Sequence, residues 1–338
     1  MRSTMILPLV ILSLGFAQAA AAEQIQLYGE AHLSVEWLDD GDRAGMNTSS
    51  NASRIGFRTH TELQPGLTAM MQIEQGLRMD NGAGNWASRD SFVGLRGDFG
   101  MLRLGYMQSP LMLIRSRLDL FGNRIGDLRN LTKLDDQFGG KNWDFRLRNG
   151  IHYRTPALNG LVADVHYATN DNTGTSQDAR NADVLSVGLG YTLGDLLLLG
   201  AWERAGGVRP QATRLAAQWQ YQDWTVMGLA QFARLRASGN VDTYGVGVSR
   251  RWQDLTFKAH VFTTDSSLSD RDATLFAIGA DWHLGDRAVL YLTYATTRND
   301  RLANYNMSGG GAHGAELDLT GLEGNTPQGL AVGFIFPF

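Results

Sequence analysis

The sequence contains no cysteine, which excludes disulfides and cysteine-based metal sites. Beyond residue 22 it has no apolar run of 18 residues or more, so helical membrane spans are excluded as well. It has no excess of basic residues either, because the formal net charge is −4, and this argues against a nucleic-acid partner. A chain of this size without disulfides must rely on a large core or on a closed hydrogen-bonded architecture.

Proline is scarce and glycine is abundant, with 7 prolines and 40 glycines in 338 residues. The glycine share exceeds the usual value of about 7%, and the glycines follow no collagen-like period. Glycine among alternating strands indicates many turns and many places where backbone passes close to backbone.

The first 22 residues have the features of a secretory signal peptide. Arg2 is followed by the apolar run from Met5 to Phe16, and three alanines precede Glu23. The apolar run is too short to span a bilayer about 30 Å thick. We therefore expect residues 1–22 to be removed and residues 23–338 to form one domain.

Strict alternation of apolar and polar residues predicts strands along the whole of that domain. The first is the clearest, because every second residue from Ile25 to Trp37 is apolar or small and the residues between them are mostly polar. Two strands, near 196–203 and 288–296, are apolar on both parities, so their orientation stays open. In all we expect sixteen strands, near 25–37, 53–60, 67–76, 90–97, 101–107, 146–155, 161–167, 184–192, 196–203, 213–221, 224–234, 242–252, 255–264, 274–284, 288–296 and 328–338.

The connections between these strands alternate between short and long. Seven are tight turns, such as 64–66 and 222–223, and the other eight, such as 38–52 and 297–327, are mostly longer. A soluble sandwich would mix the two kinds at both ends, whereas an outer-membrane barrel has short periplasmic turns and longer extracellular loops. The sequence therefore predicts an all-β fold, a transmembrane antiparallel β-barrel of sixteen strands.

Aromatic residues and the last strand fit the same fold. Tryptophan and tyrosine lie near strand ends, as in a membrane girdle, whereas a sandwich core would favour strand centres. Apolar residues occupy every second position from Leu330 to Phe338, a face that we expect to meet lipid. Pro337 lacks an N–H group, so we expect ladder pairing to stop there.

Four stretches resemble the trimeric general porins of Gram-negative outer membranes, in particular those of beta-proteobacteria and Neisseria. They are IQLYGEA at 25–31, SRIGFR at 53–58, RDSFVGL at 89–95 with its continuation through FGMLRLG at 99–105, and NGIHYRTP at 149–156. The resemblance implies a water-filled channel narrowed by a third loop, here 108–145, that folds into the pore.

The same resemblance implies a constriction with a basic wall and an acidic loop. The family's arginines match Arg54, Arg89 and Arg146 by motif, although Arg89 has the parity of the lipid-facing Val93 unless the strand has already ended there. Four further arginines lie at strand positions whose parity points to the lumen. The inward loop contributes two candidate aspartates, although the charges of the segment 108–145 sum to +1. The additional candidates are Arg58, Arg96, Arg103 and Arg148 on the wall, and Asp119 and Asp127 on the loop.

The resemblance further implies a homotrimer in contact with outer-membrane lipid and lipopolysaccharide. Phe338 would be the signal read by the barrel-assembly machinery, and small hydrophilic solutes would be the cargo. Basic residues on both sides of the waist favour a mild preference for anions. Alternatively, the arginines pair with Glu30, Glu62, Glu74 and Asp90 as solvated wall charge.

No catalytic motif stands out in the sequence. HExxH, GxSxG and a dinucleotide fingerprint are all missing, and six of the seven histidines lie at polar positions of different strands. We expect no enzyme activity, cofactor or metal, although Asp171 and Asn172 leave calcium binding open beside ordinary turn chemistry. Three functions remain: a passive diffusion porin, a substrate-selective anion channel, and an adhesin or receptor anchored by the barrel.

Overall fold

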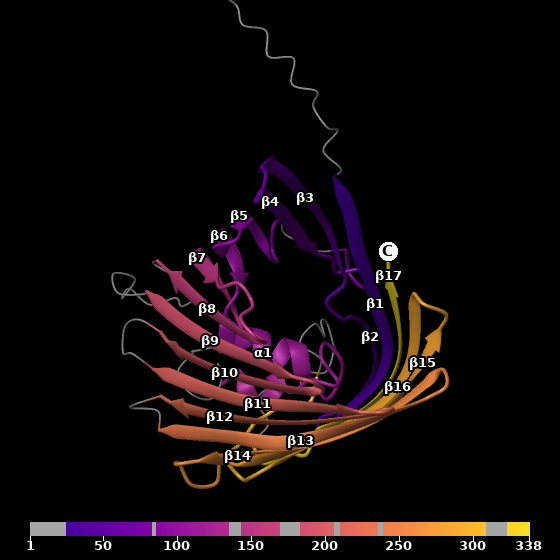
Figure 1. The fold of residues 1–338 in the computed structure, drawn as a ribbon. Coiled ribbons are helices and arrows are strands. Elements are labelled where there is room, and N and C mark those ends of the chain that lie inside the picture. The colour runs from indigo at the N-terminus through magenta and orange to yellow at the C-terminus, as the bar shows by residue number, and fades with distance from the viewer. Residues whose placement is uncertain are drawn as a thin grey trace, which may run out of the picture.

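The computed structural model describes residues 25–82, 86–134, 143–169, 183–205, 210–235, 239–308 and 323–338. The predicted signal peptide and the candidate calcium ligands Asp171 and Asn172 lie outside these residues. Within them, neighbouring strands pair antiparallel, and pairing between the first and last strands closes the ring (Figure 1). This confirms the predicted closed barrel of sixteen strands.

The strand bounds agree with the sequence analysis to within a few residues, with one exception near the N-terminus. The strands are β1 (Gln26–Asp39), β2 (Ala44–Ser50), β3 (Arg54–Gln64), β4 (Leu67–Gly76), β5 (Ser91–Gly97), β6 (Gly100–Gln108), β7 (Arg146–Arg154), β8 (Leu161–Ala168), β9 (Val184–Leu193), β10 (Leu196–Arg204), β11 (Gln211–Tyr221), β12 (Trp224–Arg234), β13 (Asn240–Trp252), β14 (Leu255–Ser266), β15 (Ala273–Leu284), β16 (Ala288–Asn299) and β17 (Gln328–Pro337).

The exception is the segment 38–52, which the sequence analysis treated as a long loop. Nearly half of it is β2, and β2 and β3 pair with successive parts of β1, so together they act as one of the sixteen barrel strands. The bend between them stays attached to β1, because Ser53 Oγ donates a hydrogen bond to the His32 carbonyl (2.9 Å). The prediction failed because β2 is polar on its inner face, where Ser49 donates to Glu36 (2.8 Å).

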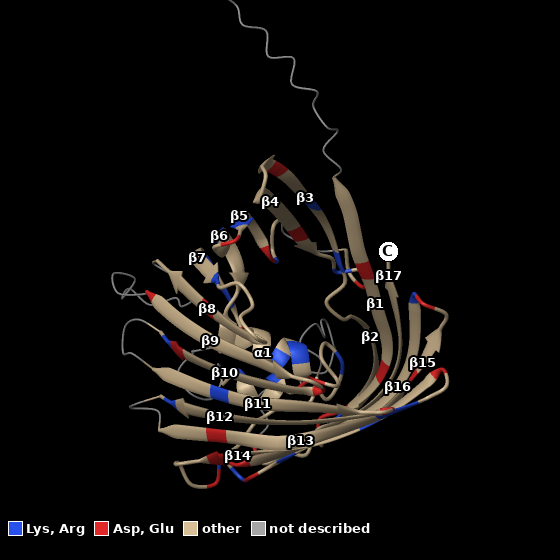
Figure 2. Cartoon of the chain, viewed as in Figure 1, with Lys and Arg blue, Asp and Glu red and all other residues tan. Residues whose placement is uncertain are grey.

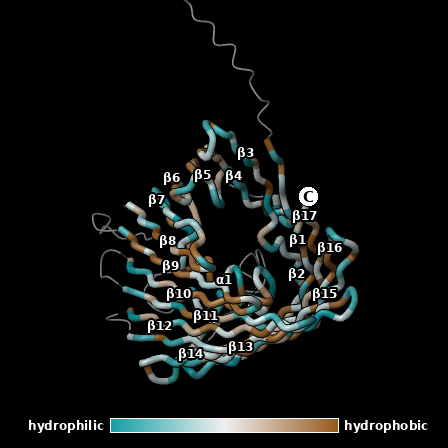
Figure 3. The backbone as a smooth tube through the Cα atoms, in the orientation of Figure 1, coloured by the Kyte–Doolittle hydropathy of each residue, from teal (hydrophilic) through white to brown (hydrophobic). Residues whose placement is uncertain are grey.

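The outer face of the barrel is a continuous apolar belt. Each of the sixteen barrel strands contributes at least one large apolar residue whose side chain is 38–58% exposed. Such an exposed surface requires lipid as its solvent. Figure 3 shows the alternation of hydrophobic and hydrophilic residues along these strands. One example from each strand is Val35, Phe57, Ile73, Val93, Leu104, Ile151, Val165, Leu189, Leu198, Leu215, Val226, Val246, Val261, Phe276, Leu292 and Val332.

The structure also shows the orientation of the two strands that are apolar on both parities. In β10, Leu198 is exposed on the outer face and Ala201 is buried inside. In β16, Leu292 is exposed and Tyr291 is 2% exposed. In both strands the even-numbered residues therefore face lipid and the odd-numbered residues face the interior, where β10 also places Leu197 and Leu199.

The C-terminal strand pairs to its last residue, so the expected stop at Pro337 was wrong. Phe338 and Gly29 exchange two backbone hydrogen bonds, of 2.9 and 3.0 Å. Neighbouring residues of a strand direct their N–H groups to opposite sides, so the nitrogen of Pro337 faces β16. The ladder between β16 and β17 has already ended at the pair Val289 and Ile335. The missing N–H therefore costs no ladder hydrogen bond.

Gly29 is the position where this closing pair is most sensitive to added volume. A Cβ atom at Gly29 would lie 2.3 Å from Cζ of Phe338 and 2.7 Å from the backbone oxygen of Arg54. We expect Gly29→Ala to destabilise the barrel by about 1–3 kcal/mol through this overlap. The temperature at which the folded band converts on SDS gels measures the effect.

Gly228→Ala is the matched control, because a Cβ there first meets an atom at 3.8 Å. Equal conversion temperatures for the two variants would contradict the predicted overlap at the seam.

Candidate functional site: the lumen and its inward loop

The loop after β6 begins with a helix that lies inside the barrel. Helix α1 (Pro110–Leu118) has proline at its first turn, and the Ser109 hydroxyl accepts a hydrogen bond from Met112 N (3.2 Å). Its buried face packs against β8, β9, β10 and β11 (Figure 1). Neither α1 nor the short α2 (Arg129–Thr132) is long and apolar enough to cross a membrane. For the residues described, the predicted inward fold of the segment 108–145 is confirmed.

Between the two helices the loop covers the wall formed by β14, β15 and β16. Phe121, Ile125 and Leu128 are fully buried in one cluster with side chains of this wall. Gly126 has a φ of +85°, and a Cβ there would lie 2.6 Å from Cβ of Ala277. Backbone and barrel wall therefore approach too closely for any other residue.

Arg214, on the inner face of β11, fixes both ends of the loop. Its side chain is 0% exposed and donates to the carboxylate of Asp144 (2.9 and 3.3 Å) and to the carbonyl of Leu111 (3.0 Å). It also donates to Gln231, which in turn donates to the carbonyl of Thr132 (2.9 Å). A buried guanidinium with this many acceptors has all its charge compensated locally.

Asp281, on β15, is the second anchor and holds the middle of the loop. Its carboxylate accepts from Arg124 of the loop (2.6 and 3.2 Å) and from Lys258 of β14 (2.9 Å). Lys258 also donates to the carbonyl of Leu120 (2.7 Å). The guanidinium of Arg124 lies 4.0 Å from the ring centre of Tyr291. One carboxylate thus serves two buried cations.

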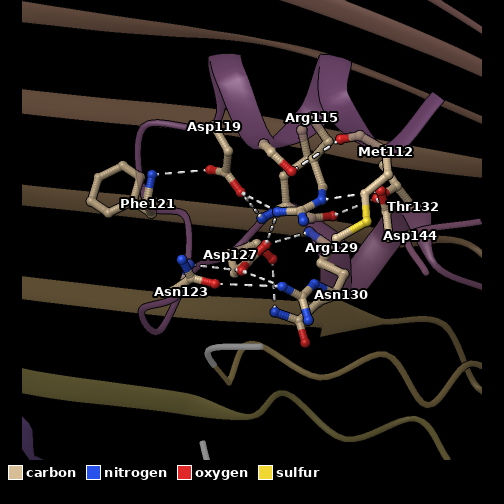
Figure 4. A network of polar contacts seen from close by, with 12 residues as sticks. Met112, Arg115, Asp119, Phe121, Asn123, Asp127, Arg129, Asn130, Thr132 and Asp144 are labelled. Carbon is tan, nitrogen blue, oxygen red and sulfur yellow. Dashed lines mark hydrogen bonds and ion pairs between the residues drawn. The ribbon is translucent and has the colours of Figure 1, made fainter. Parts of the chain in front are cut away.

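Inside the loop, Arg115 is surrounded by three carboxylates (Figure 4). Its guanidinium nitrogens lie 3.1 Å from Asp144, 3.2 Å from Asp127 and 3.8 Å from Asp119. Burial works against the charged form of Arg115, but the three carboxylates outweigh it and raise its pKa.

The two candidate pore aspartates have opposite pKa shifts within this network. Burial, and then the Asp127 carboxylate, raise the pKa of Asp119. Burial also acts on Asp127, but Arg115 and Arg129 overcome it and lower its pKa. Both side chains are 0% exposed. The expectation that they line the pore therefore needs correction, since they stabilise the loop from within.

The wall that the loop leaves uncovered also carries charged residues (Figure 2). On β3, Arg58, His60 and Glu62 alternate with the outward Phe57 and Leu63, so they face inward, and all three are exposed. Water therefore reaches the inner face of the barrel on this side. On the opposite side, inward residues such as Ala277 are fully buried.

The three arginines predicted by motif lie together, each paired with a carboxylate. Arg54 donates twice to Glu30 (2.8 and 3.2 Å) and lies 3.9 Å from Glu74. Arg89 precedes β5, so its parity does not conflict with that of Val93, and it pairs with the same Glu74. Arg146 pairs with Asp90. These ion pairs agree with most of the alternative prediction, in which the wall arginines pair with acidic neighbours.

The four arginines predicted by parity lie in different environments. Arg58 donates to Gln26 (2.8 Å), and Arg103 lies 3.1 Å from Nδ1 of His152; within the described chain neither has an ion pair with a carboxylate. Arg148 is exposed near the loop end of β7. Arg96 is exposed at the short-turn end of β5, about 20 Å along the chain from Arg89. Arg96 is thus remote from the paired arginines.

Sequence reasoning missed a second polar group on the open wall and both loop anchors. Asp164 accepts from Arg154 (2.8 and 3.0 Å) and lies 2.9 Å from Nε2 of His152. The anchors Arg214 and Asp281 were missed as well. The available signal was one charged residue at an inward position of its strand, such as Arg214 on β11.

The fold and the charged inner wall agree with the comparisons to known proteins. A family model described as Gram-negative porin matches residues 9–302. The chain belongs to the Gram-negative porin family. This confirms the predicted family, the outer-membrane location and the absence of an enzymatic fold.

This porin is also similar to curated outer-membrane proteins and to solved porin structures. Major outer membrane protein P.IB of Neisseria gonorrhoeae is 29% identical over 198 residues, which are 54% of this chain and 52% of the relative. The porin thus spans about half the length of the curated relatives it matches. Among solved structures, the anion-selective porin from Comamonas acidovorans has a TM-score of 0.80 at 22% identity, covering 94% of this chain and 100% of the other. OmpT of Vibrio cholerae, in a trimer form, has a TM-score of 0.67 at 14% identity, covering 94% and 100%.

Proposed function

We propose that this porin is a passive diffusion channel for small hydrophilic solutes and ions, with a mild preference for anions. The observation that carries the proposal is the half-covered lumen. The loop fills the side of β8–β16, while the inner face of β3 on the other side remains exposed to water. Solutes would pass between the exposed face of the loop and the wall from β1 to β7.

The anion preference rests on the charges that remain after pairing. Arg54, Arg89 and Arg146 are balanced by neighbouring carboxylates, so they contribute local dipoles rather than net charge. Arg58 and Arg103 have no such partner in the described chain, and Arg117 on α1 is exposed. In a channel with low-dielectric walls, these three guanidinium groups attract anions.

The comparisons support the proposed selectivity and suggest the assembly. One solved structure with the same fold is described as an anion-selective porin, and another was obtained in a trimer form. We extend both properties to this chain as proposals, a homotrimer of anion-preferring channels. The apolar belt would contact outer-membrane lipid and lipopolysaccharide, and Phe338 would be read by the barrel-assembly machinery.

Conductance of the purified protein in planar bilayers tests this proposal. We expect ohmic steps in groups of three. In a KCl gradient, we expect the reversal potential to have the sign that results when chloride is more permeant than potassium. A reversal potential on the potassium side would contradict the anion preference. A complete lack of conductance would instead favour a barrel-anchored adhesin or receptor.

A further inference from the structure

A cavity of about 400 Å³ lies between α1 and the inner wall of β8, β9 and β10. The loop side is formed by Leu113 and Arg117, and the wall side by Arg154, Val162, Gly190 and Leu199. The buried network of Arg115 lies on the other face of the helix, so the cavity is separate from the contacts that hold the loop.

Two guanidinium groups provide its positive charge. Arg117 is exposed on the open face of α1, one residue after the exposed Ser116. The side chain of Arg154 is 41% exposed although it is paired with Asp164. Two cations and one carboxylate leave a net positive charge, which favours an anionic group at this end of the cavity.

Apart from Ser116 and Asp164, the rest of the lining is aliphatic or has no side chain. Leu113, Val162 and Leu199 supply apolar surface, and Gly190 leaves space between them, since a Cβ there would already lie 3.2 Å from Cδ2 of Leu199. An inorganic anion such as phosphate would find no hydrogen-bond donors on Leu113, Val162 and Leu199, which leave much of the cavity apolar. A small molecule with a carboxylate and an apolar body would match both the positively charged end and the apolar lining of the cavity.

The position of the cavity suggests how it is reached. Val162 and Leu199 lie within four residues of the short-turn ends of β8 and β10, and Gly190 lies three residues before the end of β9. A solute entering from the short-turn side would therefore meet the cavity before the loop.

We propose that this cavity is a weak binding subsite for small organic carboxylates with an apolar body. The proposal rests on the proposed anion channel and names one substrate class within it. The carboxylate contacts Arg117 and Arg154, while the apolar body lies against Leu113, Val162 and Leu199. Binding must stay weak, because a channel that holds its solute tightly does not conduct it.

Benzoate is the probe, and benzamide, which has a similar shape without the charge, is its control. We expect benzoate added on the short-turn side to reduce the chloride current with saturation, and benzamide to have little effect. Gly190→Val fills the cavity and should abolish the block. Arg117→Gln should raise the half-blocking concentration about tenfold, the loss expected for one charge-assisted contact.

Gly228→Val is the matched control, because Gly228 has the same parity as the outward Val226 and Phe232 on β12, so it lies on the outer face, away from the cavity, and has room for a Cβ. It should leave the block unchanged. An equal block in Gly190→Val and the unmodified protein, or an equal effect of benzamide, would overturn the subsite while leaving the anion channel intact. Saturation-transfer NMR of benzoate with the purified protein in detergent reads binding independently of conductance, and loss of signal in Gly190→Val is again the expected result. If neither method shows saturable benzoate binding, the subsite is refuted.

Discussion

We expect Asp281→Asn to release the middle of the inward loop and to produce frequent partial closures of the channel. The substitution leaves Arg124 and Lys258 buried beside each other without their shared carboxylate. Removing one partner of a buried ion pair costs about 3–5 kcal/mol, so the released state should become more populated by a factor on the order of 100 or more. The barrel wall lies behind the segment 119–128, so the freed chain moves into the open half of the lumen. Single-channel recordings measure these closures directly.

The ion pair between Asp242 and Arg234 provides the control for this experiment. Asp242→Asn makes the same chemical change, but both side chains are about one-third exposed at the rim of the barrel. A pair in that position contributes little to stability, so the current should stay steady. Adding Lys258→Met to Asp281→Asn removes one of the two uncompensated cations and should reduce the closures. A steady current in Asp281→Asn itself would contradict the anchoring role.

We expect the double variant Arg58→Glu with Arg103→Glu to turn the channel from anion-preferring to cation-preferring. Each substitution changes the charge of the uncovered wall by −2, at positions where no carboxylate in the described chain forms an ion pair. Each unit charge contributes about 1 kcal/mol to an ion about 4 Å away even in bulk water, which suffices to reverse a mild preference. The reversal potential in a KCl gradient should change sign.

A double variant that removes opposite charges is the matched control. Arg54→Gln with Glu30→Gln eliminates a bidentate ion pair and leaves the net charge of the wall unchanged. We expect its reversal potential to stay close to that of the unmodified protein. If both double variants shift the reversal potential equally, the selectivity does not arise from the uncompensated arginines.

The barrel could be predicted from the sequence because its rules are local. Alternation along β1 or β3 follows directly from one face meeting lipid, and the alternation of short and long connections gives the topology. The inward orientation of arginines on strands could be predicted for the same reason. The parity of Arg58 and Arg103 fixes the side of the wall on which they lie.

Other features depend on contacts between distant residues, and these could not be read locally. β2 was missed because its inner face is satisfied by hydrogen bonds to Glu36 rather than by apolar packing. Asp119 and Asp127 were placed at the pore because nothing in a loop sequence shows which carboxylates turn inward. Their partner Arg115 precedes them by 4 and 12 residues, but the burial that selects it comes from the wall.

The seam between β1 and β17 has a consequence for the order in which this molecule forms. Every other pairing in the barrel joins barrel strands that follow one another in the sequence. The seam instead joins residues such as Asp39 and Gln328, which are 289 positions apart. Local hairpins form with a small loss of chain entropy, while this contact must wait until β17 is available. An incomplete chain would therefore expose two unpaired strand edges at once. The exchange of hydrogen bonds between Gly29 and Phe338 extends this closing contact one pair beyond the β1–β17 ladder.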